Sequence, residues 1–130
     1  MEEETRYLDV EQVLILYTEI FDCTVRQAAD QLRSRDGLES ALARPQFYAH
    51  YEAADLASQA AVMAHGIAET QPFIEGNKRT ALAALAAFLA INGRTTTATQ
   101  RERMQWMLDL SAGMTAHELA ERLRASLAPA

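Results

Sequence analysis

Apolar side chains recur at the three- and four-residue spacing of an α-helix directly after Asp9. Asp9 and Gln12 have the spacing of a capping box, in which each side chain accepts a backbone N–H from the other residue. The apolar face that follows consists of Val10, Val13, Leu14, Leu16, Tyr17, Ile20 and Phe21. We therefore expect a helix from residue 10 to about Asp22, and a short helix over residues 25–32.

The pattern between residues 36 and 70 predicts two helices with an irregular segment between them. Asp36 and Glu39 are spaced like a helix cap, so a helix is expected to begin there and to be stopped by Pro45. Residues 45–54 hold three aromatic residues and one histidine without a clear period, which indicates an ordered loop or a short extended flap. A long helix is expected over residues 55–70, because Pro72 cannot continue it.

Residues 77–92 form the most apolar segment of the chain. The run from Ala81 to Ile91 has eleven apolar residues, far fewer than the roughly 20 that a membrane-spanning helix needs. Because it is apolar almost all round, we expect a buried helix at the centre of the fold, with Gly93 as its left-handed stop.

Two further helices are expected near the C-terminus. Thr97 with Gln100 would cap the first, and Thr115 with Glu118 would cap the second. Met104, Trp106 and Met107 are interpreted as core residues of the first. The predicted fold class is all-α: one domain, residues 1–130, with six or seven helices around a central hydrophobic helix.

Composition supports this fold class and excludes several functions. The 130 residues include 25 Ala but only 5 Gly and 3 Pro, which favours helices over a strand-rich fold. One Cys excludes a disulfide framework and a Cys-based zinc site. A net charge of −6 argues against non-specific binding to nucleic acid. The acidic N-terminus is unlike a signal peptide, so we expect a cytoplasmic protein with neither membrane nor nucleic acid as a partner.

The segment 71–80, QPFIEGNKRT, has the composition of a phosphate site. A loop with a carboxylate and a glycine leads into a helix N-terminus, where unpartnered amides and the helix dipole favour an anion. Lys78 and Arg79 are unfavourable at that position unless an anion is bound. Glu75 is placed to hold Mg²⁺ together with phosphate oxygens. The alternative interpretation is a plain turn, with Asn77 as a cap and both cations solvated.

The same segment resembles the signature of the Fic/Doc (Fido) family, His-x-Phe-x-Asp/Glu-Gly-Asn, then Gly or Lys, then Arg. With Lys78 at its penultimate position, the segment resembles the death-on-curing (Doc) branch of the family. Leu82 adds to this resemblance, because it stands where the AMP-transferring Fic enzymes carry a second Arg. The stretch 36–45 and the central apolar helix are also similar to Doc proteins. The resemblance covers roughly residues 6–95 and implies a compact Fic/Doc-type bundle.

This resemblance implies roles for the matching residues. Glu75 would take the Mg²⁺ position, and Gly76, Asn77 and Lys78 would form the anion hole. Arg79 would contact phosphate and stabilise charge in the transition state. The resemblance also places residues 45–54 near the family's flap, where a target segment docks as an added strand.

The implied function is the toxin of a toxin–antitoxin pair. Doc-type toxins transfer phosphate from ATP to a hydroxyl of a translation factor, and elongation factor Tu is the family's known target. The alternatives are transfer of a nucleotide monophosphate (AMP), as in other Fic proteins, and a catalytically silent nucleotide-binding or interaction module. The chain lacks the self-restraining Ser/Thr-x-x-x-Glu motif followed by Gly or Asn, so a Phd-like antitoxin is the expected partner.

The chain departs from the signature at its first position, where Gln71 replaces the catalytic His. A Gln amide accepts a hydrogen bond but does not take up a proton near neutral pH. Two explanations are open: a natural variant that binds without turnover or does other chemistry, or an engineered replacement, which the otherwise intact motif favours. His50, in the expected flap, is a better substitute base than His65. His117 is expected to be solvated.

Overall fold

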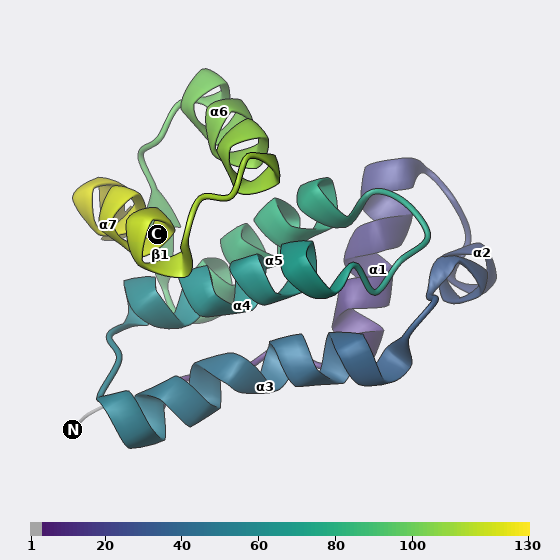
Figure 1. The fold of residues 1–130 in the computed structure, drawn as a ribbon, viewed down its shortest axis with the longest axis horizontal. Coiled ribbons are helices and arrows are strands. Elements are labelled where there is room, and N and C mark those ends of the chain that lie inside the picture. The colour runs from purple at the N-terminus through teal and green to yellow at the C-terminus, as the bar shows by residue number, and fades with distance from the viewer. Residues whose placement is uncertain (1–3) are drawn as a thin grey trace.

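The computed structural model describes residues 4–130, which form seven α-helices and one pair of short strands (Figure 1). The elements in chain order are α1 (Val10–Phe21), α2 (Val25–Gln31), α3 (Arg35–Glu52), α4 (Leu56–Thr70), α5 (Asn77–Ile91), β1 (Arg94–Thr96), α6 (Gln100–Ser111), α7 (Ala116–Ser126) and β2 (Leu127–Pro129). The all-α fold class is therefore confirmed.

Cap residues set the start of most helices. The capping box of Asp9 and Gln12 is present at α1, and Asp22 ends that helix in a left-handed conformation. Thr115 caps α7 as the sequence predicts, its hydroxyl accepting the backbone N–H of Glu118. The prediction for α6 is wrong by two residues, because Thr99 with Glu102 forms the capping box in place of Thr97 with Gln100.

Helix α3 differs most from the sequence prediction. It begins after Ser34, whose hydroxyl accepts the Gly37 N–H at 2.9 Å, and not at Asp36. It continues through Pro45 to Glu52, so the expected stop and the expected flap at 45–54 are both wrong. Proline deprives the helix of one N–H donor, but its ring is buried. This burial gives a physical reason for the helix to continue.

Helices α3 and α4 form an antiparallel hairpin, and α4 and α5 lie side by side across the middle of the molecule (Figure 1). The close approach of α3 and α4 depends on Gly66, where an added Cβ would lie 3.2 Å from the Cβ of Ala41. Nine residues of α4 and seven of α5 are buried. The predicted central helix, α5, therefore shares the centre of the fold with α4.

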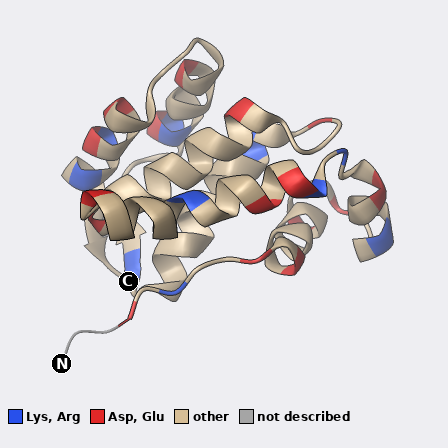
Figure 2. Cartoon of the chain, turned by 60° about the horizontal axis from the view of Figure 1, so that its bottom comes forward, with Lys and Arg blue, Asp and Glu red and all other residues tan. Residues whose placement is uncertain are grey.

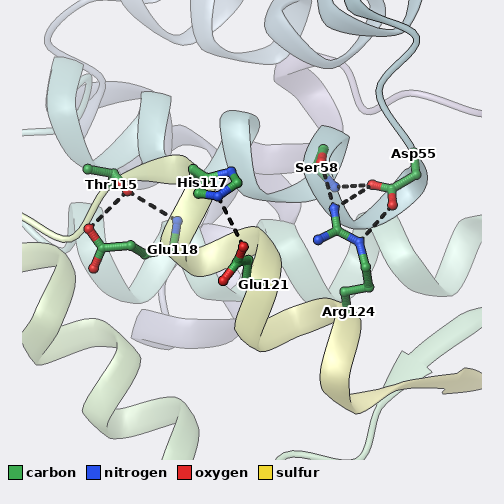
Figure 3. A network of polar contacts seen from close by, with 7 residues as sticks. All are labelled: Asp55, Ser58, Thr115, His117, Glu118, Glu121 and Arg124. Atoms are coloured by element: carbon green, nitrogen blue, oxygen red, sulfur yellow. Dashed lines mark hydrogen bonds and ion pairs between the residues drawn. The ribbon is translucent and has the colours of Figure 1, made fainter.

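Helix α7 packs along α4 and is tied to it by polar contacts, and α6 packs against α5. Strands β1 and β2, which the sequence analysis does not predict, pair antiparallel and bring residue 129 opposite Arg94. Arg124 of α7 donates to both carboxylate oxygens of Asp55 at 2.8 and 3.1 Å and to the hydroxyl of Ser58 (Figure 3). Trp106 of α6 is buried, whereas Met104 is 55% exposed, which corrects its expected core position.

Charged residues of both signs are interspersed over the surface (Figure 2). In the view of Figure 2, Lys and Arg do not gather on one face, as an extended basic surface for nucleic acid would require. Over residues 4–130, the helices lack the combined length and apolar character required to cross a lipid bilayer.

Candidate anion-binding site at the start of α5

The loop 71–76 joins α4 to α5 and is held by the last residue of α2 and the linker between α2 and α3. The backbone N–H groups of Arg33 and Ser34 donate to the carbonyl of Pro72 at 2.7 and 3.0 Å. The N–H of Ile74 donates to the carbonyl of Gln31 at 2.9 Å. These three backbone bonds, at two points of a short loop, fix its path across the end of the α3–α4 hairpin.

The centre of the loop is anchored by Phe73, whose side chain is fully buried. Its ring stacks on the ring of Tyr17 from α1, with centroids 4.4 Å apart and planes 16° apart. The hydroxyl of Tyr17 donates to the carbonyl of Glu75 at 3.2 Å. Burial, followed by the nearby Glu75 carboxylate, raises the pKa of Tyr17, so the phenol remains a hydrogen-bond donor. Phe73 therefore anchors the loop in the core.

Asn77 locks the loop against the first turn of α5. Its side-chain Oδ1 accepts the N–H of Phe73, and its Nδ2 donates to the carbonyl of Phe73, both at 2.9 Å. Asn77 is therefore the first residue of the helix, with Gly76 as the cap residue, and the interpretation of Asn77 as a plain cap is wrong. The Oδ1 atom and one Nδ2–H of the amide are thus committed to the loop, while the backbone N–H of Asn77 lacks a helical acceptor.

Gly76 is required by both backbone conformation and space. Its φ is +81°, in the left-handed region that side chains rarely adopt. An added Cβ would lie 2.3 Å from Cζ of Phe21, the last residue of α1. The carbonyl of Gly76 accepts both the N–H and the hydroxyl of Thr80, at 3.0 and 2.8 Å. The glycine thus lets the loop pass closely over the Phe21 ring and enter the helix.

The first turn of α5 presents backbone donors and two cations. No side chain caps this helix end in the described chain, so the N–H groups of Asn77, Lys78 and Arg79 lack helical acceptors. Arg79 is exposed and its guanidinium carbon lies 4.9 Å from the centroid of the Phe21 ring. Among the ion pairs formed within residues 4–130, none involves Glu75, Lys78 or Arg79. The turn can therefore accept an anion without first breaking an ion pair.

Glu75 stands one residue before Gly76, with an exposed side chain. Residues 4–130 contain no cluster of three His, Cys, Asp or Glu side chains suited to a metal ion. A single carboxylate beside an anion site suits Mg²⁺, which is commonly held by one or two carboxylates together with substrate phosphates and water. The donor set therefore fits a cation that arrives with a phosphate ligand, and not a cation held by protein alone.

Gln71 occupies the left-handed C-cap of α4, with φ +48°, and is exposed. Its carbonyl accepts a hydrogen bond from the guanidinium of Arg33. Histidine is one of the residue types enriched in this backbone region. Position 71 thus presents a side chain to solvent at the entrance of the loop and suits an imidazole as well as an amide.

The histidines lie away from this loop. His50 is fifteen residues along α3 from Arg35, about 22 Å at 1.5 Å per residue, whereas the start of α3 contacts Pro72. The expectation that residues 45–54 lie near the site, with His50 as a substitute base, is therefore wrong. His65 is half-buried on α4 in a cavity with Arg44 and Tyr48 of α3. His117 is exposed and pairs with Glu121 at 3.0 Å (Figure 3), as expected of a solvated residue.

Comparison with known families assigns the chain. The model of the Fic/DOC family matches residues 7–89, which is more than half of the chain and includes α1 to α4, the loop 71–76 and α5 as far as residue 89. The chain belongs to the Fic/DOC family. Fic/DOC proteins are generally transferases. Comparison with curated proteins gave no significant match.

A groove of about 380 Å³ lies between α5 and α6, close to the loop 71–76, and Arg79 forms part of its lining. Its apolar floor includes Leu82, Ala86, Trp106 and Met107, and the charged residues that line it are Arg79 and Arg103. Since no carboxylate among residues 4–130 lines it, the groove favours an apolar segment that carries negative charge.

The sequence analysis missed two residues that contact the loop 71–76 or the first turn of α5. Tyr17 and Phe21 were assigned only to the apolar face of the first helix, yet both contact the loop 71–76 or the residues beside it. Their four-residue spacing puts them on one face of the last turn of α1. That spacing alone does not indicate that a site lies opposite, because every core-facing helix shows it.

Proposed function

We propose that this chain is a Doc-like transferase whose nucleotide-binding loop is intact and whose general-base position is held by Gln71. The triphosphate of ATP would bind at the N-terminus of α5, to the backbone donors of Gly76, Asn77 and Lys78 and to the side chains of Lys78 and Arg79. In this proposal the chain binds nucleotide but transfers phosphate very slowly. Its biological role is that of a toxin paired with an antitoxin.

The single observation that carries the proposal is the uncapped first turn of α5 with two unpaired cations. Within the described chain the turn has neither a side-chain cap nor an acidic partner for Lys78 or Arg79. Cations at a helix N-terminus oppose the dipole, so an anion between them and the amides is needed to make the arrangement favourable. Membership of the Fic/DOC family supports a nucleotide phosphate as that anion.

The exposed Glu75 would hold Mg²⁺ together with the phosphates. The bound ion would supply charge neutralisation on the phosphate oxygens. Tyr17 holds the Glu75 backbone through its hydroxyl, which keeps the residue beside the first turn of α5. The carboxylate would then be oriented by the loop, with no second protein carboxylate required.

With an imidazole at position 71, the residues would perform phosphoryl transfer. The imidazole takes the proton of a Ser, Thr or Tyr hydroxyl on the target protein as that oxygen attacks the γ-phosphorus of ATP. The new oxygen–phosphorus bond forms while the bond between the γ-phosphorus and its bridging oxygen breaks, and ADP leaves. Arg79 and Lys78 stabilise the negative charge that the phosphoryl oxygens carry during transfer. Gln71 provides no such base, which predicts a loss of about 10² to 10⁴ in rate.

Leu82 favours phosphate transfer over AMP transfer. It stands where AMP-transferring Fic proteins carry a second Arg, and it lines the apolar groove beside α6. The chain therefore has one arginine fewer for holding the outer phosphates of ATP as a leaving group. AMP transfer remains the second candidate reaction, with attack at the α-phosphorus and pyrophosphate as the leaving group. Translation elongation factor Tu is the proposed target.

The groove between α5 and α6 supports a Phd-like antitoxin as the second partner. An amphipathic helix with apolar residues toward Leu82 and Trp106, and carboxylates toward Arg79 and Arg103, would match its lining. Arg103→Glu should then weaken antitoxin binding. Arg101→Glu is the matched control, because Arg101 is exposed on α6 without lining this groove.

A paired transfer assay tests the function. The chain and its Gln71→His variant are incubated with purified elongation factor Tu, or with whole lysate, and ATP labelled at either the γ- or the α-phosphate. We expect Gln71→His to raise γ-label transfer at least 10²-fold and to slow cell growth unless an antitoxin is co-expressed. Label from the α-phosphate would identify AMP transfer instead. If both proteins bind Mg²⁺–ATP in calorimetry but neither transfers label, the chain is a silent nucleotide-binding module.

A further inference from the structure

We infer that Phe21 is a positioning residue of this site: its ring holds the Arg79 guanidinium in place and sets how closely the loop at Gly76 approaches α1. The inference rests on the proposed function for the role of Arg79. It goes beyond that function, because it assigns the geometry of the phosphate-contacting arginine to a side chain outside the loop.

The Phe21 ring contacts the site at two points. On one side the guanidinium carbon of Arg79 lies 4.9 Å from the ring centroid. On the other, Cζ and Cε2 of the ring lie 2.3 and 2.8 Å from where a Cβ on Gly76 would be. The ring therefore fills the space that the glycine leaves open and also supports the Arg79 guanidinium.

The position of the ring is itself fixed. Tyr17, one turn earlier on α1, has its ring centroid 4.4 Å from the centroid of the Phe21 ring and 4.4 Å from that of Phe73. A row of three aromatic rings thus runs from the buried loop anchor to the exposed arginine. Packing of this kind limits the ring to one orientation, so an arginine resting on it is limited too.

The physical consequence is preorganisation of Arg79. An exposed arginine without an acidic partner loses much rotamer freedom when it binds phosphate. A cation–π contact holds the guanidinium before the ligand arrives and does so without neutralising its charge. An ion pair with a carboxylate at the same place would compete with the phosphate, and among residues 4–130 Arg79 has none. The aromatic ring can therefore orient the arginine without occupying its donors.

The test is a double-mutant cycle on Mg²⁺–ATP affinity, measured by calorimetry in the Gln71→His background. Phe21→Leu keeps an apolar side chain but removes the π face, and Arg79→Gln keeps a polar side chain but removes the cation that the ring would hold. Phe21→Leu should weaken ATP binding about 2- to 5-fold, the range of an exposed cation–π contact, and this effect should vanish when residue 79 is Gln. Phe47→Leu is the matched control, because Phe47 is 56% exposed on α3 and lies toward the far end of that helix from the loop.

A purely structural role for Phe21 predicts a different result. Loss of packing would weaken ATP binding equally with Arg or Gln at position 79, and such additivity would overturn the inference. A second measurement does not depend on nucleotide binding. The Nε–Hε signal of Arg79 in an NMR spectrum should be shifted by the ring current of Phe21, and Phe21→Leu should remove that shift.

The two measurements separate the inference from the proposed function. If the NMR signal shows that the ring holds Arg79 in solution, but ATP binds neither the Gln71→His protein nor its Phe21→Leu variant, the proposed function is wrong and the positioning of Arg79 stands. If ATP binds but Phe21→Leu leaves the Arg79 signal unchanged, the positioning inference is wrong and the proposed function stands. Unchanged signals together with additive binding energies would reject the inference on both measurements.

Discussion

The side-chain amide of Asn77 makes two reciprocal hydrogen bonds with the backbone of Phe73, four residues earlier. Both groups are buried, and both bonds measure 2.9 Å. The loop between α4 and α5 is consequently closed by the first residue of the helix that it precedes. Asn77 therefore contributes to the anion site chiefly by fixing the shape of the loop, since both ends of its amide are bonded to the Phe73 backbone.

Asn77→Ala should destabilise the protein more than an ordinary loss of one hydrogen bond. The substitution leaves a buried N–H and a buried carbonyl of Phe73 without their partner, so we expect a loss of about 2 kcal/mol or more in the free energy of unfolding. Urea unfolding measures it. Gln105→Ala removes an exposed side-chain hydrogen bond to Asp109 on α6 and should change stability by no more than about 0.5 kcal/mol. Equal effects of the two substitutions would contradict the closing role of Asn77.

Gly76→Ala should be more damaging than Gly93→Ala. Both glycines have positive φ, +81° and +72°, so both substitutions incur the left-handed penalty of about 1 kcal/mol. Only at Gly76 does the new Cβ meet another group, Cζ of Phe21 at 2.3 Å, which adds about 1–3 kcal/mol of overpacking. The difference in the free energy of unfolding between the two variants, measured by thermal unfolding, gives the energetic cost of the clash. Combining Gly76→Ala with Phe21→Ala should recover part of it, and the absence of any recovery would count against a direct contact.

The course of most helices follows from local chemistry that the sequence displays. Asp9 with Gln12 and Thr115 with Glu118 cap their helices as predicted, because a cap involves residues only three positions apart. Gly93, also predicted, has positive φ. The anion site around Glu75 could be predicted for the same reason, because the backbone donors of a loop that leads into a helix come from consecutive residues.

The errors arise where tertiary packing overrides a local signal. Pro45 reads as a helix stop, but its ring is buried within α3, and the helix continues for seven residues beyond it. The resemblance places the aromatic segment that follows beside the site, whereas the antiparallel pairing of α3 with α4 carries it to the opposite end. The contacts of Phe21 with Gly76 and Arg79 join residues more than fifty positions apart, and one sequence contains no signal for such a pairing.

The ion pair between Asp55 and Arg124 should make stability sensitive to acid (Figure 3). Hydrogen bonds from the Arg124 guanidinium hold the pKa of Asp55 far below its usual value. The pair therefore stabilises the fold fully above the unfolded pKa of about 3.9 and progressively less as the pH falls below it. Asp55→Asn keeps a good N-cap for α4 but loses the charge, so wild type should be the more stable near pH 7.

The comparison is made by urea unfolding at several pH values between 7 and 3. The stability gap between wild type and Asp55→Asn should narrow below about pH 4, as the unfolded chain takes up a proton that the folded Asp55 does not. Arg124→Gln removes the other partner of the ion pair. The stability gap between wild type and Arg124→Gln should therefore also narrow below about pH 4. A gap that stays constant down to pH 3 would show that the pair does not lower the pKa of Asp55 in solution.

Glu75→Ala should remove the Mg²⁺ dependence of nucleotide binding. The proposal gives the ion one protein carboxylate, so without it ATP should bind with similar affinity in Mg²⁺ and in EDTA. Calorimetric titration with ATP under both conditions measures the ratio of the two affinities. Glu19→Ala is a suitable control, since Glu19 is exposed on α1 and outside the loop. If Mg²⁺ strengthens ATP binding equally in Glu75→Ala and wild type, Glu75 is only a loop residue.

Arg79→Ala should weaken ATP binding by about 1.5–3 kcal/mol, the range of a hydrogen bond to a charged group. The exposed guanidinium has no acidic partner among residues 4–130, so its removal costs the fold little and the effect should appear in binding. Thermal unfolding of the variant checks that the fold is retained. Undiminished affinity for ATP in a folded Arg79→Ala protein would mean that the triphosphate binds elsewhere.

The pH profile of the Gln71→His variant should identify position 71 as the base. A general base acts only when deprotonated, so kcat/KM should be low in acid, rise through about pH 6.5, the ordinary pKa of a histidine side chain, and then level off. Gln71→Glu places a base with an ordinary pKa of about 4.3 at the same point, and its activity should be nearly constant from pH 5.5 to 8.5. Histidine suits the left-handed backbone at position 71, so a failure to fold is not expected to mask the result. If the wild-type chain shows the same rise as Gln71→His, another group supplies the base. If Gln71→His is active but independent of pH across this range, the imidazole binds the target hydroxyl without taking its proton, and the catalytic role proposed for position 71 is wrong.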